Sequence, residues 1–177
     1  LALFRPRKGL EILLKALHIL RACELPVRLR VVGPFETPQY EREIRTCASN
    51  LGLDGLIDWA GFRQDVSAEL QQMDVLVLPS LLSEAMPMSI LEAMAVGTVV
   101  VGTRVDGITD LICDKQDGLL VEPGDPDDLA RALSSLIRGQ VDAACLRANA
   151  WHKQHLRFSD RSMAAGVARV YREILQT

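Results

Sequence analysis

The stretch VLVLPSLLSEAMPMSILEAMAVGTVVVGT, residues 75–103, decides the fold. It opens with an apolar run that ends at Pro79, which is typical of a strand covered on both faces of a parallel sheet. A helix is expected over residues 88–96, and the β-branched run at 98–102 predicts the next strand. Because strand, helix and strand follow one another directly, the stretch indicates a βαβ unit.

The same alternation continues on both sides of this unit. Strands are expected at 1–4, 27–32, 56–60, 74–78, 98–102 and 118–121, and helices at 10–23, 39–51, 66–72, 88–96, 107–113, 127–138 and 160–175. Asp125 and Pro126 supply an N-cap and a first-turn proline for the helix at 127–138. The less regular stretch 139–159 predicts a broken helix. The predicted fold class is α/β, a Rossmann-like three-layer αβα sandwich with a parallel sheet of about six strands.

Composition limits the possible classes of function. With 177 residues, 49% of them hydrophobic, the chain is the size of one domain with a real core. A net charge of −3 gives no basic field that would attract nucleic acid. No apolar run approaches the ~20 residues that span a bilayer, and no signal peptide is visible, so we expect a cytoplasmic protein. The scattered cysteines predict reduced thiols: Cys23, Cys47, Cys113 and Cys145.

The first residues look like the interior of a strand. All four residues of Leu1–Phe4 are apolar, the first charged residue is Arg5, and no turn precedes the segment. We therefore expect the chain to be cut from a larger protein whose N-terminal part is absent.

The start of the predicted helix at 88–96 could bind an anion. Pro87 fits the first turn, where its missing N–H costs nothing, which would leave the N–H groups of Met88, Ser89 and Ile90 free. A helix N-terminus with free N–H groups at the carboxyl edge of a sheet is a cradle for phosphate.

Two glutamates flank this cradle. Glutamate is almost never fully buried unless it is paired, so Glu84 and Glu92 need partners. Glu92 lies one turn beyond Ser89 on the same face, where its carboxylate could accept two hydrogen bonds from a vicinal diol such as that of ribose. The alternative is that Glu84 forms a surface pair and Glu92 a salt bridge with an arginine.

Cations precede the first predicted helix. Arg5, Arg7 and Lys8 follow the strand at 1–4 and could neutralise a diphosphate at the same edge. A solvated loop is the alternative. His152 and His155 are three residues apart, but nothing of matching spacing completes a metal site. The sequence also lacks the P-loop, the dinucleotide-binding glycine motif and the hydrolase nucleophile motif.

Several motifs in order along the chain resemble one family. They are KG at 8–9, VVG at 31–33, Gly61, the whole of 75–103, DGITDLI at 106–112 and DGLLVEPGD at 117–125. Together they resemble the C-terminal domain of family 4 retaining glycosyltransferases, the glycosyl transferases group 1, whose GT-B architecture places two Rossmann-like domains across a cleft. The spacing of two Glu separated by seven residues within 75–103 is the most specific part of the match.

The resemblance implies that residues 1–177 are a single domain that binds a nucleoside diphosphate sugar, with UDP or GDP as nucleotide. It implies no prosthetic group and no metal. An absent N-terminal domain would bind the glycan or lipid acceptor to which the hexosyl group is transferred with retention, and it would contact the helices within 140–177. Association with the inner face of the membrane would also run through that domain. The fragment alone would be inactive.

The resemblance also implies roles for individual residues. Glu84 and Lys8 would be catalytic, the first beside the reacting sugar carbon and the second facing the diphosphate. Glu92 would bind the ribose, and main-chain N–H groups of Met88 and Ser89 the diphosphate. The remaining implied donor contacts are Arg5, Met86 and Phe62.

The chain departs from the family pattern at three places. Leu3 replaces an arginine, whose phosphate contact Arg5 or Arg7 would have to supply. The residues after Glu84 read Ala-Met-Pro in place of Gly-Phe-Gly, and Asp110 replaces a glutamate. These departures leave open a catalytically inactive nucleotide-sugar-binding or interaction domain, or a structural flavodoxin-like domain.

Overall fold

The computed structural model describes residues 1–175, so the last two residues of the predicted domain lie outside the described part. In chain order the elements are the 3₁₀ helix η1 (Pro6–Lys8), α1 (Leu10–Ala22), β1 (Leu29–Val32), α2 (Pro38–Asn50), the 3₁₀ helix η2 (Asp54–Leu56), β2 (Ile57–Gly61), α3 (Val66–Gln71), β3 (Val75–Leu78), α4 (Met88–Val96), β4 (Val99–Thr103), β5 (Leu119–Val121), α5 (Pro126–Ile137), α6 (Ala143–Arg157) and α7 (Asp160–Leu175). The predicted alternation of strands and helices is confirmed over most of this length.

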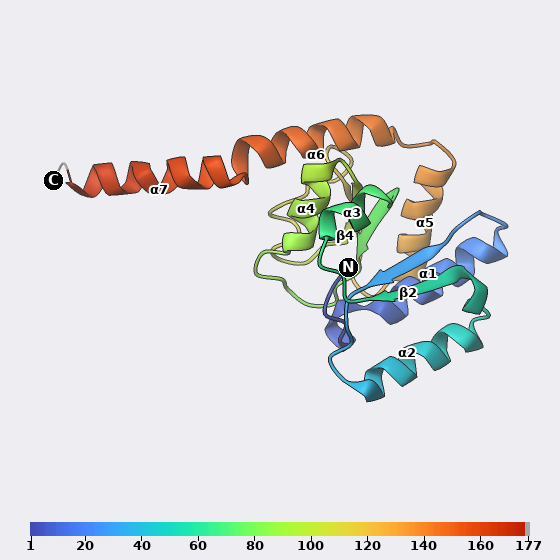
Figure 1. Ribbon diagram of the computed structural model, residues 1–177. Helices are drawn as coiled ribbons and strands as arrows, with labels where there is room; N and C mark the ends of the chain where they lie inside the picture. The colour runs from blue at the N-terminus through green and yellow to red at the C-terminus, as the bar shows by residue number, and fades with distance from the viewer. Residues whose placement is uncertain (176–177) are drawn as a thin grey trace.

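The strands form two parallel sheets, with helices packed on both sides (Figure 1). One sheet pairs β1 with β2, and the other has the order β3-β4-β5. This confirms the predicted α/β class with parallel strands. The predicted single sheet of about six strands is instead divided into sheets of two and three strands.

The division occurs where residues 1–4 were predicted to form a strand. Of these residues only Phe4 makes a β-bridge, with Phe35, while the N–H of Ala2 donates to the carbonyl of Val32. Pro34 has no N–H to return a bond, so the ladder cannot alternate in the normal way. The segment is extended and paired, but it is too short to join the two sheets.

Two hydrophobic clusters lie on opposite faces of the strands. Val99 and Val101 of β4 belong to the first cluster, with leucines of α1 and α5, while Val100 belongs to the second, with Ile90 and Met94 of α4. All five residues of β4 are buried. Successive side chains of a strand point to opposite faces, so β4 is covered on both, as its continuous apolar sequence predicts.

Two predicted elements were wrong. Residues 106–111 form consecutive turns in place of a helix at 107–113, because Gly107 adopts the left-handed conformation, with φ of 81°, and interrupts the helical path. The stretch 139–159 contains the continuous helix α6. Asp142 caps its N-terminus by accepting from the N–H of Cys145, and burial of Leu146 and Ala150 fixes its inner face.

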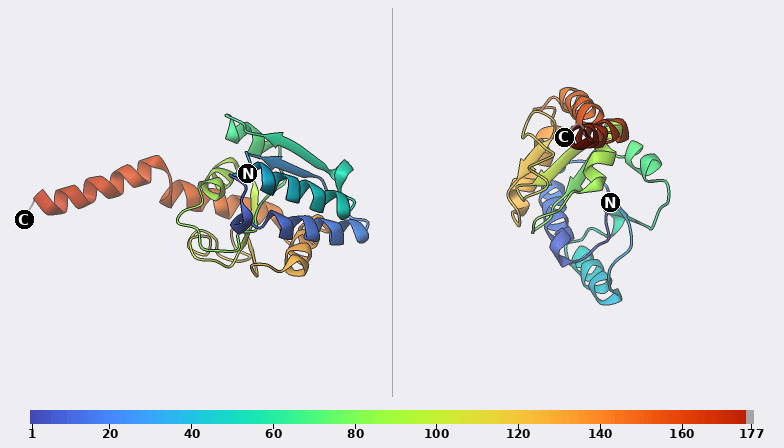
Figure 2. Two further views of the ribbon diagram at one scale, coloured as in Figure 1. Left: turned by 90° about the horizontal axis from the view of Figure 1, so that it is seen from below. Right: turned by 90° about the vertical axis from the view of Figure 1, so that its left-hand side faces the viewer.

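The last helix, α7, extends away from the body of the molecule (Figures 1 and 2), and none of its described residues is buried. Its exposed apolar side chains recur at helical spacing and form a stripe, consisting of Met163, Val167, Val170, Tyr171 and Ile174. Among residues 1–175, no helix combines the length and the apolar character needed to cross a bilayer.

Candidate functional site

The candidate site forms where η1 and the loops after β3 and β4 meet. The N–H of Leu81 donates to the carbonyl of Arg7 at 2.8 Å, and that of Glu84 donates to the carbonyl of Asp106 at 2.9 Å. Any Cβ on Gly9 would lie 2.1 Å from the carbonyl oxygen of Pro79, so only glycine allows the two segments this close. Backbone contacts therefore fix the three loops relative to one another.

Glu84 is the centre of this arrangement. Its carboxylate accepts hydrogen bonds from Lys8 Nζ at 2.6 Å and Ser80 Oγ at 2.7 Å, and Arg7 lies 3.7 Å away. Only 7% of the Glu84 side chain is exposed, so the surface pair considered as an alternative is wrong. Burial by itself would raise the pKa of Glu84, but the hydrogen bonds from Lys8 and Ser80 and the charges of Lys8 and Arg7 hold it below the ordinary value. Glu84 is therefore a buried, ionised carboxylate.

The sequence argument missed Ser80 as part of the site. Ser80 is fully buried, and its carbonyl accepts a 2.6 Å hydrogen bond from Thr103 Oγ1, which connects the ends of β3 and β4. It is the first polar residue after the apolar run of β3. At the carboxyl end of a parallel strand, that position is itself a signal of a site residue.

The N-terminus of α4 offers two free N–H groups, not three. Pro87 is the N-cap residue, outside the first turn, and its carbonyl accepts from the N–H of Ile90 at 3.0 Å. The predicted freedom of the Ile90 N–H is therefore wrong. The N–H groups of Met88 and Ser89 have no acceptor among residues 1–175 and remain available to an anion.

Glu92 lies one turn further along α4 and is half-buried. Its carboxylate has no hydrogen bond or ion pair within the described chain, so the arginine salt bridge considered as an alternative is absent. Burial raises the pKa of Glu92 above its ordinary value, since no cation offsets the loss of water. The residue is an acceptor without a donor.

The other predicted residues lie further apart. Arg5 pairs with Glu36 at 3.5 Å and so does not join Lys8 at Glu84, although its Nε is buried without a partner among the described residues. Met86 and Phe62 are exposed, the latter just beyond β2.

His152 and His155 both pack against Trp151. The ring of His155 stacks on that of Trp151 with centroids 4.0 Å apart, and His152 meets the same indole edge-on. Within residues 1–175, no three His, Cys, Asp or Glu side chains are grouped to hold a metal ion. The four cysteines are unpaired thiols.

Comparisons with known proteins identify the family of the chain. Residues 2–139 match the family described as Glycosyl transferases group 1. The chain is 33% identical over 136 residues to the phosphatidyl-myo-inositol mannosyltransferase of Mycobacterium leprae, covering 77% of this chain and 35% of that protein. It is 35% identical over 136 residues to the lipopolysaccharide core biosynthesis glycosyltransferase LpsE of Rhizobium meliloti, covering 76% and 37%.

A solved structure shows the same fold. The complex of Anabaena HepE with UDP superposes with a TM-score of 0.90 at 26% identity, covering 97% of this chain and 47% of that chain. This superposition over almost the whole chain confirms the predicted α/β, Rossmann-like fold of GT-B type. The chain spans between about a third and a half of these proteins. With a family match over most of its length and relatives above 30% identity, the chain belongs to the glycosyl transferases group 1 family.

Proposed function

We propose that this chain is the donor-binding half of a retaining, family 4 type hexosyltransferase. It binds a nucleoside diphosphate sugar, and the hexosyl group passes to a glycan or lipid acceptor held by a second, N-terminal domain. The observation that carries the proposal is the pairing of an unpartnered, half-buried Glu92 with two free N–H groups at the start of the same helix. The glycosyltransferase relatives favour this function over an inactive interaction domain.

In this proposal the helix start binds the nucleotide. The N–H groups of Met88 and Ser89 donate to the diphosphate, which the N-terminal end of the helix dipole also favours. The carboxylate of Glu92, one turn deeper, accepts hydrogen bonds from the ribose hydroxyls. UDP is the first nucleotide to test because the HepE structure contains it, and GDP is the second.

Transfer breaks the bond between the anomeric carbon and the diphosphate oxygen, whose electron pair leaves with the nucleotide. Lys8 and the helix N–H groups stabilise the negative charge on that oxygen, so we propose no requirement for a metal ion. The ionised Glu84 stabilises positive charge at the sugar carbon, while the acceptor oxygen forms the new bond and gives its proton to the departing diphosphate oxygen. Lys8 Nζ lies 2.6 Å from the Glu84 carboxylate and keeps it ionised. The same lysine therefore serves both the charge on the diphosphate oxygen and the charge at the sugar carbon.

The helices within 140–177 also have a place in the proposal. The apolar stripe of α7 projects from the donor domain with no partner inside it. We propose that it packs against the acceptor-binding domain, through which the full protein would also reach the inner face of a membrane. The long extension of α7 away from the body supports this (Figure 2).

Calorimetric titration with UDP, GDP and ADP, with and without magnesium, tests the function. We expect one nucleotide to bind independently of magnesium. Glu92→Gln is expected to weaken binding by roughly 1.5–3 kcal/mol, because a charge-assisted acceptor is lost. The matched control is Glu43→Gln on the exposed face of α2, which should leave affinity unchanged. Equal affinity of the wild type and Glu92→Gln would remove Glu92 from the ribose site, and binding of no nucleotide would contradict the donor-binding function.

A further inference from the structure

The two oxygens of the Glu84 carboxylate have different surroundings. Lys8 Nζ donates to Oε1 at 2.6 Å, and Ser80 Oγ donates to the same oxygen at 2.7 Å. Oε2 accepts no hydrogen bond from residues 1–175, and the guanidinium of Arg7 lies 3.7 Å from it. The carboxylate is therefore held by one oxygen and open at the other.

Ser80 is the donor that decides which oxygen is held. The torsion that sets the carboxylate plane of a glutamate is soft, so hydrogen bonds determine where each oxygen points. The ammonium group of Lys8 carries three donors and could bridge both oxygens, whereas a hydroxyl has a single proton to donate. Because Ser80 directs that proton to Oε1, the plane is fixed and Oε2 keeps its lone pairs.

Ser80 is itself held in place by Thr103, the last residue of β4. Thr103 Oγ1 donates to the carbonyl of Ser80 at 2.6 Å, and both residues are fully buried. On the other side, the N–H of Leu81 donates to the carbonyl of Arg7 at 2.8 Å, which fixes the residue after Ser80. The main chain at Ser80 is therefore fixed by β4 and η1 together.

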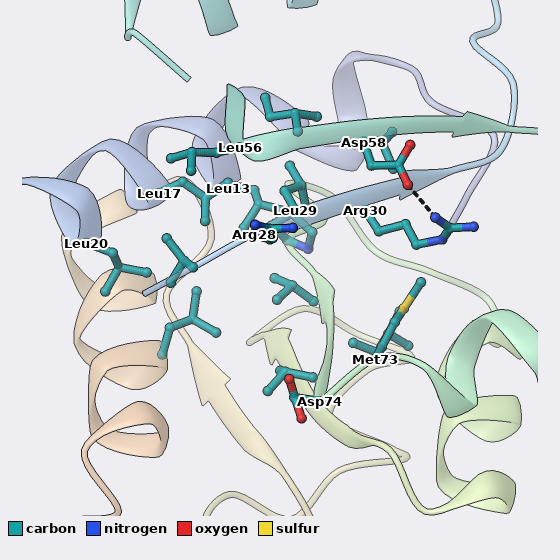
Figure 3. Close-up of a pocket in the computed structure, with 18 of the residues that line it drawn as sticks. Leu13, Leu17, Leu20, Arg28, Leu29, Arg30, Leu56, Asp58, Met73 and Asp74 are labelled. Carbon is teal, nitrogen blue, oxygen red and sulfur yellow. Dashed lines mark hydrogen bonds and ion pairs between the residues drawn. The ribbon is translucent and has the colours of Figure 1, made fainter. Parts of the chain in front are cut away.

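The open oxygen does not face the space between the sheets. A cavity of about 1020 Å³ lies there (Figure 3), and its lining includes Lys8 and Pro79 but neither Glu84 nor Ser80. Among residues 1–175, Oε2 is also not one of the fully buried atoms that lack a partner, so it keeps access to solvent. A ligand can therefore reach Oε2 from the solvent side of the loops.

We propose that Ser80 and Thr103 are positioning residues that turn Oε2 of Glu84, and not Oε1, toward the transferred sugar. The inference rests on the proposed function, in which Glu84 lies beside the reacting carbon of a nucleoside diphosphate sugar. Oε2 accepts a hydrogen bond from a sugar hydroxyl and faces the positive charge that develops at that carbon. Ser80 and Thr103 act through Glu84 and do not touch the sugar.

A matched pair of variants separates positioning from structural support. Thr98, directly before β4, is 3% exposed, and its Oγ1 donates to the carbonyl of Leu70 at 2.8 Å. Thr103→Val and Thr98→Val therefore remove the same kind of buried hydrogen bond at opposite ends of one strand. Both should lower the free energy of unfolding. Thr103→Ser, which keeps the hydroxyl, is the rescue variant, and Ser80→Ala removes the donor to Glu84 itself.

Calorimetric titrations with UDP and UDP-glucose give the first readout. We expect the ratio of the dissociation constants, UDP-glucose over UDP, to rise about tenfold in Ser80→Ala and about threefold in Thr103→Val, because the charge-assisted contact of Oε2 with the sugar is misplaced. The ratio should keep its wild-type value in Thr98→Val and Thr103→Ser. The dissociation constant for UDP should be the same in all four variants.

Crystal structures of the wild type and Ser80→Ala give the second readout, which needs no ligand. We expect both donors on Oε1 in the wild type, and in the variant a turned carboxylate plane with Lys8 bridging both oxygens. An unchanged plane or an unchanged ratio in Ser80→Ala would overturn the proposal, as would equal rises of the ratio in Thr98→Val and Thr103→Val.

Failure of the proposed function gives a different result. If the wild type bound neither UDP nor UDP-glucose, the donor-binding function would be contradicted, and with it the sugar as the partner of Oε2. The crystal structures would still decide whether Ser80 sets the orientation of the carboxylate.

Discussion

Glu84 and Glu92 lie near the start of the same helix but in opposite electrostatic environments. Hydrogen bonds from Lys8 and Ser80 hold the pKa of Glu84 low despite burial, whereas burial without a cation raises the pKa of Glu92. The spacing of the two residues identified both as functional candidates. It could not assign their partners, because Lys8 lies 76 positions before Glu84 in the chain and reaches it only through tertiary structure.

The raised pKa of Glu92 predicts a pH dependence of donor binding. Only the ionised carboxylate accepts both hydrogen bonds from a diol, so binding is strongest above the raised pKa and weakens as the pH falls through it. The loss therefore begins at a higher pH than the ordinary value of 4.5 would give. UDP-glucose is the suitable ligand because its diphosphate does not titrate in this range. Calorimetry from pH 7 to 5 should show weakening in the wild type and a flat profile in Glu92→Gln, and identical profiles would refute the assignment.

Removing the cation beside Glu84 should destabilise the domain. In Lys8→Met the carboxylate of Glu84 stays buried and loses its closest counter-charge. We expect the free energy of unfolding, measured in urea at pH 7, to fall by about 3 kcal/mol. The wild-type contribution of Glu84 is complete above pH 4.5 and is lost as the pH falls through its lowered pKa. In the variant burial dominates and raises the pKa, so acidification to pH 5 should recover part of the stability.

The double variant Lys8→Met with Glu84→Gln is the control. Because it leaves no buried charge, it should be more stable than Lys8→Met alone at pH 7. A double variant as unstable as Lys8→Met would show that the loss arises from packing of the lysine stem.

At the scale of elements, the periodicity of the sequence predicted most helices and strands, because their apolar faces carry the information. It predicted α4 at its observed bounds, since Pro87 and Gly97 mark both ends. It failed at residues 106–111 and 143–157. The turns depend on Gly107 approaching a loop distant in sequence. Helix α6 has a local start signal in the Asp142 cap, but its continuity depends on burial of Leu146 and Ala150 against distant parts of the chain.

Gly107 allows the turn after β4 to pack directly against the backbone of Glu84. A Cβ there would lie 1.8 Å from the carbonyl oxygen of Glu84, and φ is 81°. Gly107→Ala should therefore cost about 2–5 kcal/mol, the sum of left-handed strain and overpacking. Gly139→Ala is the control, since its φ is 66° but nothing lies within 4 Å of the added carbon. It should cost about 1–2 kcal/mol of strain alone. If both variants lost the same free energy of unfolding in chemical denaturation, the Glu84 loop would move aside for the added carbon without cost.

At the scale of the whole molecule, the composition and the strand rhythm predicted an α/β domain with parallel strands. The division into two sheets was not predictable, because it depends on Leu1–Phe4 making a single β-bridge, with Phe35, in place of a full strand. The order of strand, loop and helix predicted that the candidate site lies at the carboxyl edge of the sheet, and the candidate residues Lys8 and Glu84 do meet where η1 and the loop after β3 come together. The extension of α7 away from the body was also not evident, since its amphipathic pattern equally fits a helix packed on the core.

Removal of α7 tests whether it stabilises the donor domain. Because none of its described residues is buried, a chain ending at Ser159 should unfold in urea within about 0.5 kcal/mol of the full chain. The truncated chain should also keep its affinity for nucleotide. A loss above about 1 kcal/mol would show that α7 is part of the domain core and not a free element.

The contact between Lys8 and Glu84 also affects folding kinetics. Lys8 follows the segment paired with β1, and Glu84 follows β3, so the pair forms only after the regions of the two sheets have docked. Closing a loop of 76 positions is entropically expensive and slows folding relative to local helix formation. A state in which only one of the two sheets has formed would lack the contact between Lys8 and Glu84. We therefore expect the candidate site to form late in folding, so that hydrogen-exchange protection of the Glu84 loop reports completion of the native state.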